Sequence, residues 1–187
     1  MKSRLNNSDL LNILLLEYDK LKEEQNSRIS MRDSLIYISL GIFGAIFSFT
    51  MTNQSFMYTL LLIPPLSVIL SWLYISNDSK ILEIKKYIKN NLEPKIVKLF
   101  PDKVEIFEWE KAYRDNSFKK LKKVIQFFLE EITFSLSAIS ALVTFFVFTK
   151  EITFILSLVI FIDVIFILIS MIIIYGHSDL KEMISKK

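Results

Sequence analysis

The sequence contains no cysteine, and only one histidine, three glycines and four prolines among its 187 residues. Without cysteine the chain has no disulfide, no thiol nucleophile and no cysteine-ligated zinc or iron–sulfur site. The single histidine, His177, is followed directly by a serine and an aspartate, but adjacent residues do not face one another as a catalytic triad requires. No glycine-rich phosphate loop is present. We therefore expect no enzyme, no metal site and no cofactor.

Apolar residues are abundant instead, at 52% of the chain with a mean hydropathy of +0.40. They concentrate in four stretches, residues 34–52, 56–75, 132–148 and 152–175. A helix that crosses the hydrocarbon core of a bilayer needs about 20 mostly apolar residues. The sequence predicts an all-α integral membrane protein with four transmembrane helices arranged as two hairpins.

Basic residues avoid one side of this arrangement. Of the 23 lysines and arginines, 22 lie before the first stretch, between the second and third, or after the fourth, and only Lys150 lies in a short link. Positive charge marks the cytoplasmic side. We expect a bacterial inner membrane protein with an N-terminal cytoplasmic helix at 1–33, hairpins at 34–75 and 127–175, a cytoplasmic helical insert at 76–126 and a cytoplasmic tail at 176–187.

The N-terminal segment reads as an amphipathic helix over residues 7–33. Ser8 and Asp9 are candidate N-caps, and no glycine or proline precedes Gly41, so the helix can continue into the first span. Large residues recur on one face at Leu11, Leu14, Tyr18 and Leu21. This face predicts either self-association or packing against another cytoplasmic helix.

The insert is expected to form three short helices. Asn77, Asp78 and Ser79 are candidate caps for a helix to about residue 91, and Pro94 ends that helix or starts another. Further helices are expected at 103–114 and 118–128. This is too little mass for an enzyme core, so we expect the insert to pack on the N-terminal helix or on copies of itself.

Two spans contain features that affect helix packing. Gly41 and Ala45 form a small-x-x-x-small pair, which allows close helix contact either within the chain or between copies. Pro64 and Pro65 fall near the middle of the second apolar stretch and predict a kink. The kink would be a static bend or a gating hinge.

Asp163 is the one charge within the spans. It lies midway along the fourth stretch, where a carboxylate costs several kcal/mol unless it is protonated, paired or hydrated. Ser137, Ser140 and Thr144 share a helical face of the third span and are its expected partners. Asp163 would either line a hydrated path for cations or protons, or hydrogen-bond in neutral form to fix helix packing, or lie nearer an interface.

Charged residues next to the spans have a common interpretation as headgroup-level anchors. These are Arg28 and Arg32 before the first span, and Glu130 and Glu131 at the start of the third. A lysine cluster, Lys119, Lys120, Lys122 and Lys123, is expected to contact anionic lipid. With Trp109 and Tyr113 it could instead bind an anionic nucleotide-type ligand, although core packing of the aromatics is the alternative. We expect no duplex nucleic acid partner.

The residues Glu17-Tyr18, Leu21-Lys22, Arg28-Ile29, Arg32-Asp33 and Tyr37, leading into a glycine-containing span, resemble the start of small bacterial four-span proteins. The overall plan is similar to membrane components of antiphage defence, namely channel effectors of the Hailong type and membrane sensors of the Kiwa type. The resemblance implies a homo-oligomer, in particular a tetramer, acting with a cytosolic partner or a nucleotide-derived signal.

These observations favour a homo-oligomeric ion-conducting effector controlled from the cytoplasmic side. The alternative is a non-conducting sensor or scaffold that recruits a cytosolic protein. A small proton-coupled transporter is a third hypothesis, in which Asp163 would carry the proton.

Overall fold

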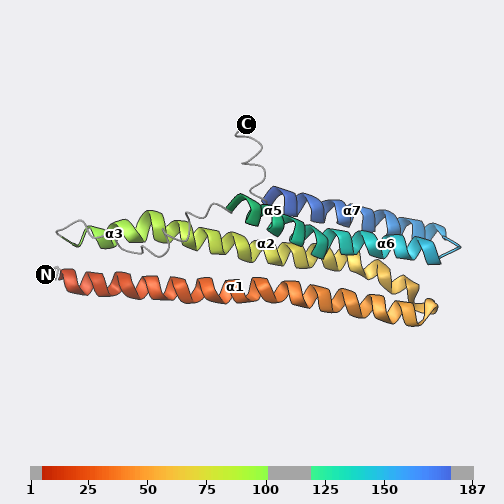
Figure 1. Ribbon diagram of the computed structural model, residues 1–187, viewed down its shortest axis with the longest axis horizontal. Coiled ribbons are helices and arrows are strands. Elements are labelled where there is room, and N and C mark those ends of the chain that lie inside the picture. The colour runs from red at the N-terminus through yellow and green to blue at the C-terminus, as the bar shows by residue number, and fades with distance from the viewer. Residues whose placement is uncertain (1–5, 101–118, 178–187) are drawn as a thin grey trace, which may run out of the picture. The chain divides into compact units, whose positions relative to one another are not determined.

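A computed structural model describes residues 6–100 and 119–177, and every secondary-structure element in these ranges is a helix. Figure 1 shows the elements in chain order. The α-helices are α1 (Asn7–Thr52), α2 (Ile63–Tyr87), α3 (Glu93–Val97), α5 (Lys119–Glu131), α6 (Ser137–Phe148) and α7 (Phe154–His177). Non-α segments join several of them: the 3₁₀ helix η1 (Gln54–Leu62) and the π-helices η2 (Ile88–Leu92) and η3 (Ile132–Leu136).

The four predicted spans are helical. Helices Asn7–Thr52, Ser55–Val97, Val124–Phe148 and Phe154–His177 are each long and apolar enough to cross a membrane. The expectation that the N-terminal helix runs into the first span is also confirmed, because α1 is one helix of 46 residues. The all-helical fold and its four candidate spans are thus shown, and together they suggest a membrane location.

Two compact units divide the chain. The N-terminal unit consists of Met1–Met31 and Asn77–Lys119, and the apolar unit consists of Arg32–Ser76 and Lys120–Lys187. Helices α1 and α2 each contribute residues to both units.

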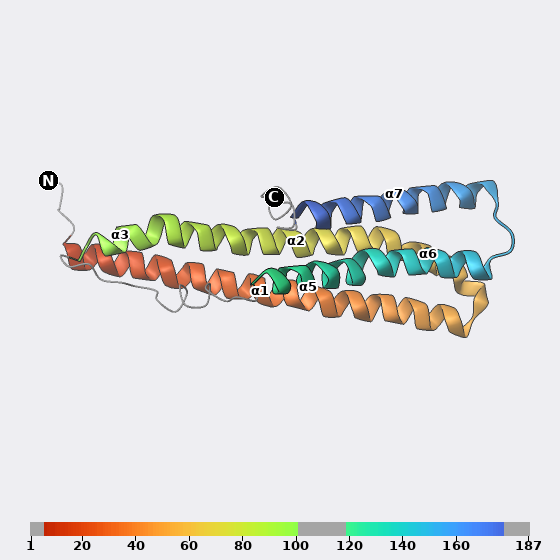
Figure 2. The same ribbon diagram turned by 45° about the horizontal axis from the view of Figure 1, so that its top comes forward.

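In the N-terminal unit, the first half of α1 lies beside the end of α2 and α3 (Figure 2). Buried Leu14 packs with Ile88, Leu92 and Ile96. Around this core lie Leu11, Tyr18, Leu21, Ile84 and Leu99. The face that the sequence predicted for the N-terminal helix is therefore the packed face, and its partner is the described part of the insert.

The predicted start of the N-terminal helix at residue 7 is confirmed, but the candidate cap residues are wrong, both at Ser8 and Asp9 and at Asn77. Helix α1 begins at Asn7, which places Asp9 in the first turn, where its charge still favours the positive end of the helix dipole. No helix begins at Asn77, since α2 continues through it to Tyr87. The apolar face persists from Tyr74 to Ile81, and no glycine or proline interrupts the helix there, so the polar triplet does not end it.

The double proline lies at a helix start rather than inside an α-helix. Residues 54–62 are 3₁₀ helix, capped by Asn53, whose Oδ1 accepts a 2.9 Å hydrogen bond from the backbone N–H of Ser55. Pro64 and Pro65 then occupy the first turn of α2, where a missing N–H costs little. The sequence predicted a kink inside one continuous α-helix. The structure has instead a change from 3₁₀ helix to α-helix just before the two prolines.

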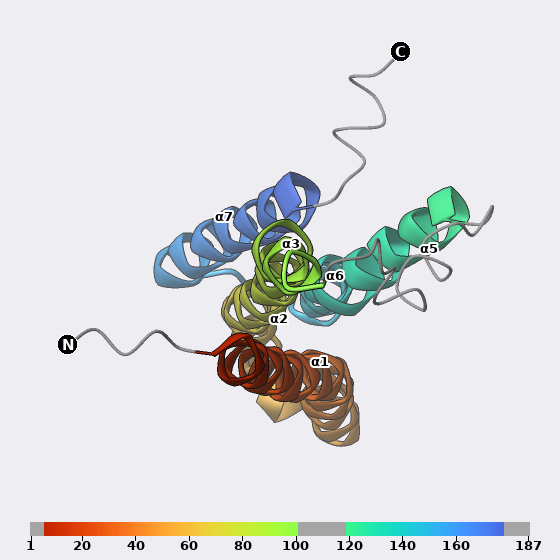
Figure 3. The ribbon, with the colours of Figure 1, turned by 90° about the vertical axis from the view of Figure 1, so that its left-hand side faces the viewer.

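The apolar unit is built around α2. Viewed end-on, α7 and the η3–α6 helix lie on different sides of α2 (Figure 3). Phe134 and Phe145 are fully buried, and the Phe134 ring lies 5.8 Å from that of Tyr74. Most of the large apolar residues on the other faces are exposed, as expected for surfaces that lie in lipid.

Candidate functional site

The buried face of α7 carries the carboxylate of the fourth candidate span. Its buried residues recur at alternate spacings of four and three: Leu156, Ile160, Asp163, Ile167, Ser170 and Ile174. Asp163 is only 2% exposed. It therefore lies against helices of its own chain and not on the outer surface of the bundle.

Two serines of α2 lie on the face that α7 and η3 contact. Ser67 and Ser71 are fully buried. Ser67 Oγ donates a 2.8 Å hydrogen bond to the carbonyl of Phe134 in η3, and Ser170 Oγ of α7 donates to Ser71 Oγ at 3.5 Å. These contacts join α2, η3 and α7 through small polar groups, as is common between helices in lipid.

The hydrogen bonds between the helices also fix the level of Asp163. Helices α2 and α7 run in the same direction (Figure 2), and Ser71 meets Ser170. Pro64 precedes Ser71 by seven residues, and Asp163 precedes Ser170 by seven residues. Seven residues make about two helical turns, so Pro64 and Asp163 lie at the same level of the two helices. The bond from Ser67 to Phe134 brings the next residue, Ser135, to within about one turn of this level. We call Ser67, Ser71, Ser135, Asp163 and Ser170 the polar layer.

One carboxylate oxygen of the polar layer has no partner. Among the described residues, the buried side-chain atoms without a hydrogen bond of ordinary geometry are Asp163 Oδ2 and Ser135 Oγ, and of these two side chains Ser135 still interacts with the Glu131 carboxylate. A buried oxygen without a partner is costly, and more so when it carries charge. The polar layer therefore has capacity for a further ligand.

The double proline adds a backbone acceptor near the same level. The carbonyl of Leu61 would normally accept from residue 64 in a 3₁₀ helix or residue 65 in an α-helix, and both are prolines without an N–H. The preceding carbonyl, of Leu60, is satisfied by the N–H of Ile63. Leu61 is a buried residue, and neither of the two residues that would usually donate to its carbonyl has an N–H.

Positive charge is absent from the elements around Asp163. Helix α7 contacts η1, η3 and α6, whose sequences contain no Lys, Arg or His. The part of α2 from Ile63 to Ser76 contains none either. No group of three or more His, Cys, Asp or Glu that could hold a metal occurs within residues 6–100 and 119–177.

Two of the three hydroxyls that the sequence predicted as partners of Asp163 are hydrogen-bonded to backbone carbonyls nearby in their own chain segment. Ser137 Oγ donates to the carbonyl of Ile132 at 3.3 Å, and Ser140 Oγ donates to the carbonyl of Ser137 at 2.9 Å. Ser140 is exposed and Thr144 half-buried. The buried hydroxyls that sequence reasoning missed are on α2 and α7, and their spacing was visible: Ser67 and Ser71 are four apart, and Ser170 is seven after Asp163.

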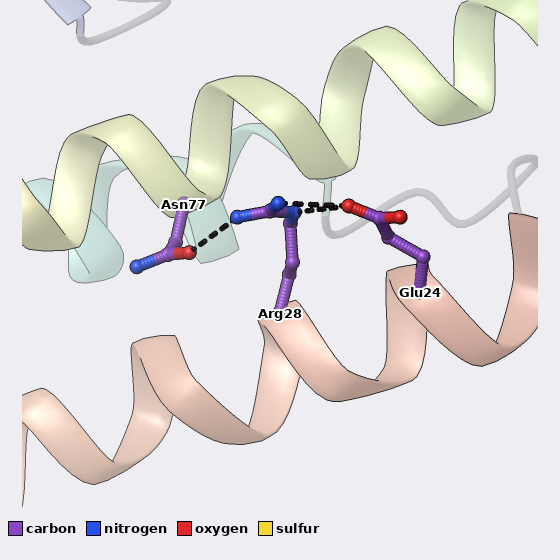
Figure 4. Close-up of polar contacts among 3 residues, drawn as sticks. All are labelled: Glu24, Arg28 and Asn77. Atoms are coloured by element: carbon purple, nitrogen blue, oxygen red, sulfur yellow. Dashed lines mark hydrogen bonds and ion pairs between the residues drawn. The ribbon is translucent and has the colours of Figure 1, made fainter.

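A second polar site holds the N-terminal unit together (Figure 4). Arg28 Nε and Nη2 donate to Glu24 Oε1 at 2.9 and 2.7 Å, and Arg28 Nη1 donates to Asn77 Oδ1 at 3.2 Å. Gln25 is buried, and its Nε2 donates to the carbonyl of Ile81 at 3.4 Å. Arg28, expected as a lipid anchor, thus bridges α1 and α2.

The other predicted juxtamembrane residues are placed as follows. Arg32 donates from Nε and Nη2 to Asp33 Oδ1 at 3.0 and 2.9 Å. Glu130 is buried and accepts from Gln126 Nε2 at 2.9 Å, while Glu131 is half-buried. The backbones of Lys119, Lys120, Lys122 and Lys123 belong to α5, but their side chains are not described. Trp109 and Tyr113 lie outside the described residues.

The two glycines of the first span face open space. A Cβ added at Gly41 or Gly44 would meet nothing within 4 Å. The packed side of α1 carries Leu35, Ser39, Phe43 and Thr50, all buried. At about 3.6 residues per turn, the opposite side carries Ser34, Gly41, Ala45, Ser48 and Thr52, all exposed. We call these five residues the small-residue face of α1.

Comparison with protein-family models, curated proteins and solved structures found no match to this chain.

Proposed function

We propose that this chain is a subunit of a homo-oligomeric ion channel or pore of the bacterial inner membrane, controlled from the cytoplasmic side. The observation that carries this proposal is the small-residue face of α1. A pore between copies has to be lined or closed by surfaces that one copy leaves exposed. Asp163 is buried within its own chain and would not line such a pore.

The small-residue face has the composition that close packing around an axis requires. Glycine and alanine allow helix backbones to approach in lipid, where large apolar side chains give little preference for association. Ser34, Ser48 and Thr52 supply hydroxyls for a polar lining. The outward side of α7, by contrast, consists almost entirely of large apolar residues.

Control from the cytoplasmic side is supported by charge and by chain continuity. Almost all basic residues lie outside the spans on the side expected to be cytoplasmic. Helix α1 passes without a break from the N-terminal unit to the residues of the small-residue face. By the resemblance to antiphage membrane proteins, the signal would be a cytosolic protein or a nucleotide-type molecule.

The absence of cysteine allows a direct test. Ser48→Cys gives a chain with one thiol on the small-residue face, and Ser157→Cys gives one on the exposed side of α7 as the matched control. We expect oxidation in membranes to cross-link the Ser48→Cys copies, and a cationic thiol reagent to reduce conductance of that variant in planar bilayers. The control should show neither effect.

Silent bilayers with every signal tested, together with an absence of cross-links at Ser48→Cys, would overturn the proposal. The second candidate is a non-conducting scaffold, favoured by the exposure of Ile13 (51%) and Leu16 (61%) in the N-terminal unit. Cross-linking without conductance, and loss of a bound cytosolic protein in Leu16→Ser, would favour the scaffold.

A further inference from the structure

We propose that the polar layer is a binding site for a monovalent metal cation of the Na⁺ class, held within each protomer by Asp163. This proposal does not depend on the channel function, since the site lies inside one chain. It is separate from the small-residue face, which is on the outer side of α1.

The Asp163 carboxylate has no positively charged side chain near it. An ionised carboxylate in an apolar helix requires a positive partner. None of η1, η3, α6 or the Ile63–Ser76 part of α2 supplies a lysine, arginine or histidine to Asp163. A bound cation would supply the missing charge.

The polar layer also has more oxygen acceptors than donors. A proton on Asp163 would satisfy one acceptor only, whereas the layer holds Asp163 Oδ2 without a hydrogen bond, the Leu61 carbonyl without its usual local donors, and Ser135 Oγ, whose one interaction is with the Glu131 carboxylate. Carboxylate, hydroxyl and carbonyl oxygens are the ligands of hard cations. Carbonyls freed at an interruption of a membrane helix are a common source of Na⁺ ligands.

Two segments that are not α-helical lie next to the helix that carries Asp163. Helix α7 contacts both the 3₁₀ segment η1 and the π-helix η3. Such departures from α-helix are frequent at functional sites. The register places Asp163 level with the junction between η1 and α2 and within about one turn of Ser135 in η3. Two helix interruptions and one carboxylate thus occupy one level of the bundle.

The test uses the full chain purified in detergent with the background substitution Trp109→Phe, which leaves Trp72 as the only tryptophan. Trp72 adjoins Ser71, which contacts Ser170. NaCl replaces choline chloride at constant ionic strength and at pH 8, and both Trp72 fluorescence and thermal stability are followed. LiCl and KCl arms report selectivity.

We expect a saturable response to Na⁺ in both readouts. Asp163→Asn, which keeps the side-chain shape, should weaken the apparent affinity by at least about 10-fold. Ser135→Ala should weaken it less, and Ser140→Ala, on the exposed side of α6, should have no effect. The affinity should fall as pH is lowered, because the ligand must be deprotonated. Tyr58 and Tyr74 on the surrounding span elements are neutral in this range. Glu131 interacts with Ser135, so Glu131→Gln is measured beside Asp163→Asn and should leave the pH dependence in place.

Identical curves in Na⁺ and choline for the unsubstituted Asp163 protein would overturn the proposal, and this result needs no variant to fold. A stability that depends on pH but not on Na⁺ would also overturn it, because it would show a proton site alone. Na⁺ binding by a protein that does not conduct would support the proposal while contradicting the channel function.

Discussion

The two units of this protein use polar side chains in opposite ways. In the N-terminal unit, long polar side chains join the helices: Arg28 reaches Asn77, Gln25 reaches the Ile81 carbonyl, and Tyr87 reaches Glu17. In the apolar unit, short hydroxyls make the contacts between helices, and one carboxylate is left without a partner. The difference follows from the solvent each unit is expected to meet. Water tolerates exposed charge, whereas lipid requires that polar groups be small, satisfied or functional.

The largest effect that distinguishes the units should come from a matched pair of truncations. Leu92 and Leu60 are both 0% exposed, the first in the N-terminal unit and the second in the apolar unit. Leu92→Ala should destabilise its unit by about 2–5 kcal/mol, because both hydrophobic transfer and packing are lost. Leu60→Ala should cost less, because lipid solvates an exposed leucine as well as the core does, which leaves only the packing loss.

Hydrogen exchange in nanodiscs, read by mass spectrometry for each unit, would measure both losses. Equal losses for the two variants would contradict the assignment of the units to water and lipid. Ile69→Ala, at an exposed position of α2, is the control and should change neither unit measurably.

The second-largest effect should come from removing one polar contact between helices in each unit, a charged one in the N-terminal unit and a hydroxyl one in the apolar unit. Arg28→Ala removes the bridge from α1 to Asn77 and should destabilise the N-terminal unit by about 1.5–3 kcal/mol, since hydrogen bonds to charged groups are the stronger ones. Arg28→Lys should recover only part of this, because an ammonium group lacks the planar fork. Ser67→Ala should cost about 0.6 kcal/mol, the average for hydrogen bonds between membrane helices.

Lys20→Ala serves as the control for charge, because Lys20 pairs with Glu23 at 2.7 Å but both side chains are 68% exposed. Surface pairs contribute little, so its effect should be small. If Lys20→Ala and Arg28→Ala were equally destabilising, the bridge to Asn77 would have no special role. Urea denaturation monitored by circular dichroism compares these variants.

The same difference explains how much could be predicted from the sequence. In the N-terminal unit the apolar face stands out against polar neighbours, so the sequence predicts Leu14, Tyr18 and Leu21 as a packing face without identifying its partner. Helix α7 is apolar on all sides, so its periodicity located a span but could not show which face packs. The polar layer was therefore missed, and the hydroxyls of α6 were chosen by spacing alone.

Changes of helix type were also beyond sequence reasoning. A double proline predicts an interruption, but not that a 3₁₀ helix precedes it or that the prolines begin a new α-helix. The π-helix at Ile132–Leu136 has no proline or glycine to announce it. A contact from another helix meets this segment, namely the hydrogen bond from Ser67 to the Phe134 carbonyl.

The smallest expected effect comes from a solvent-exposed hydrogen bond of the N-terminal unit. Tyr87 OH donates a 2.7 Å hydrogen bond to Glu17 Oε1, and this bond to a carboxylate raises the pKa of Tyr87 above its usual value of 10.0. Because the folded-state pKa is the higher one, the contribution to stability is fully present below the unfolded pKa. It is lost as pH rises through the folded pKa, so the effect lies above about pH 10.

Ultraviolet difference titration of Tyr87 measures this shift against the Glu17→Gln variant, in which the tyrosine should titrate at lower pH. Tyr87→Phe should make the stability of the N-terminal unit less dependent on pH above 10, with little change at pH 7, because the bond is exposed to solvent. A tyrosine pKa unchanged by Glu17→Gln would mean that this contact does not persist in solution. The N-terminal unit would then depend on Arg28, Gln25 and its leucine core alone.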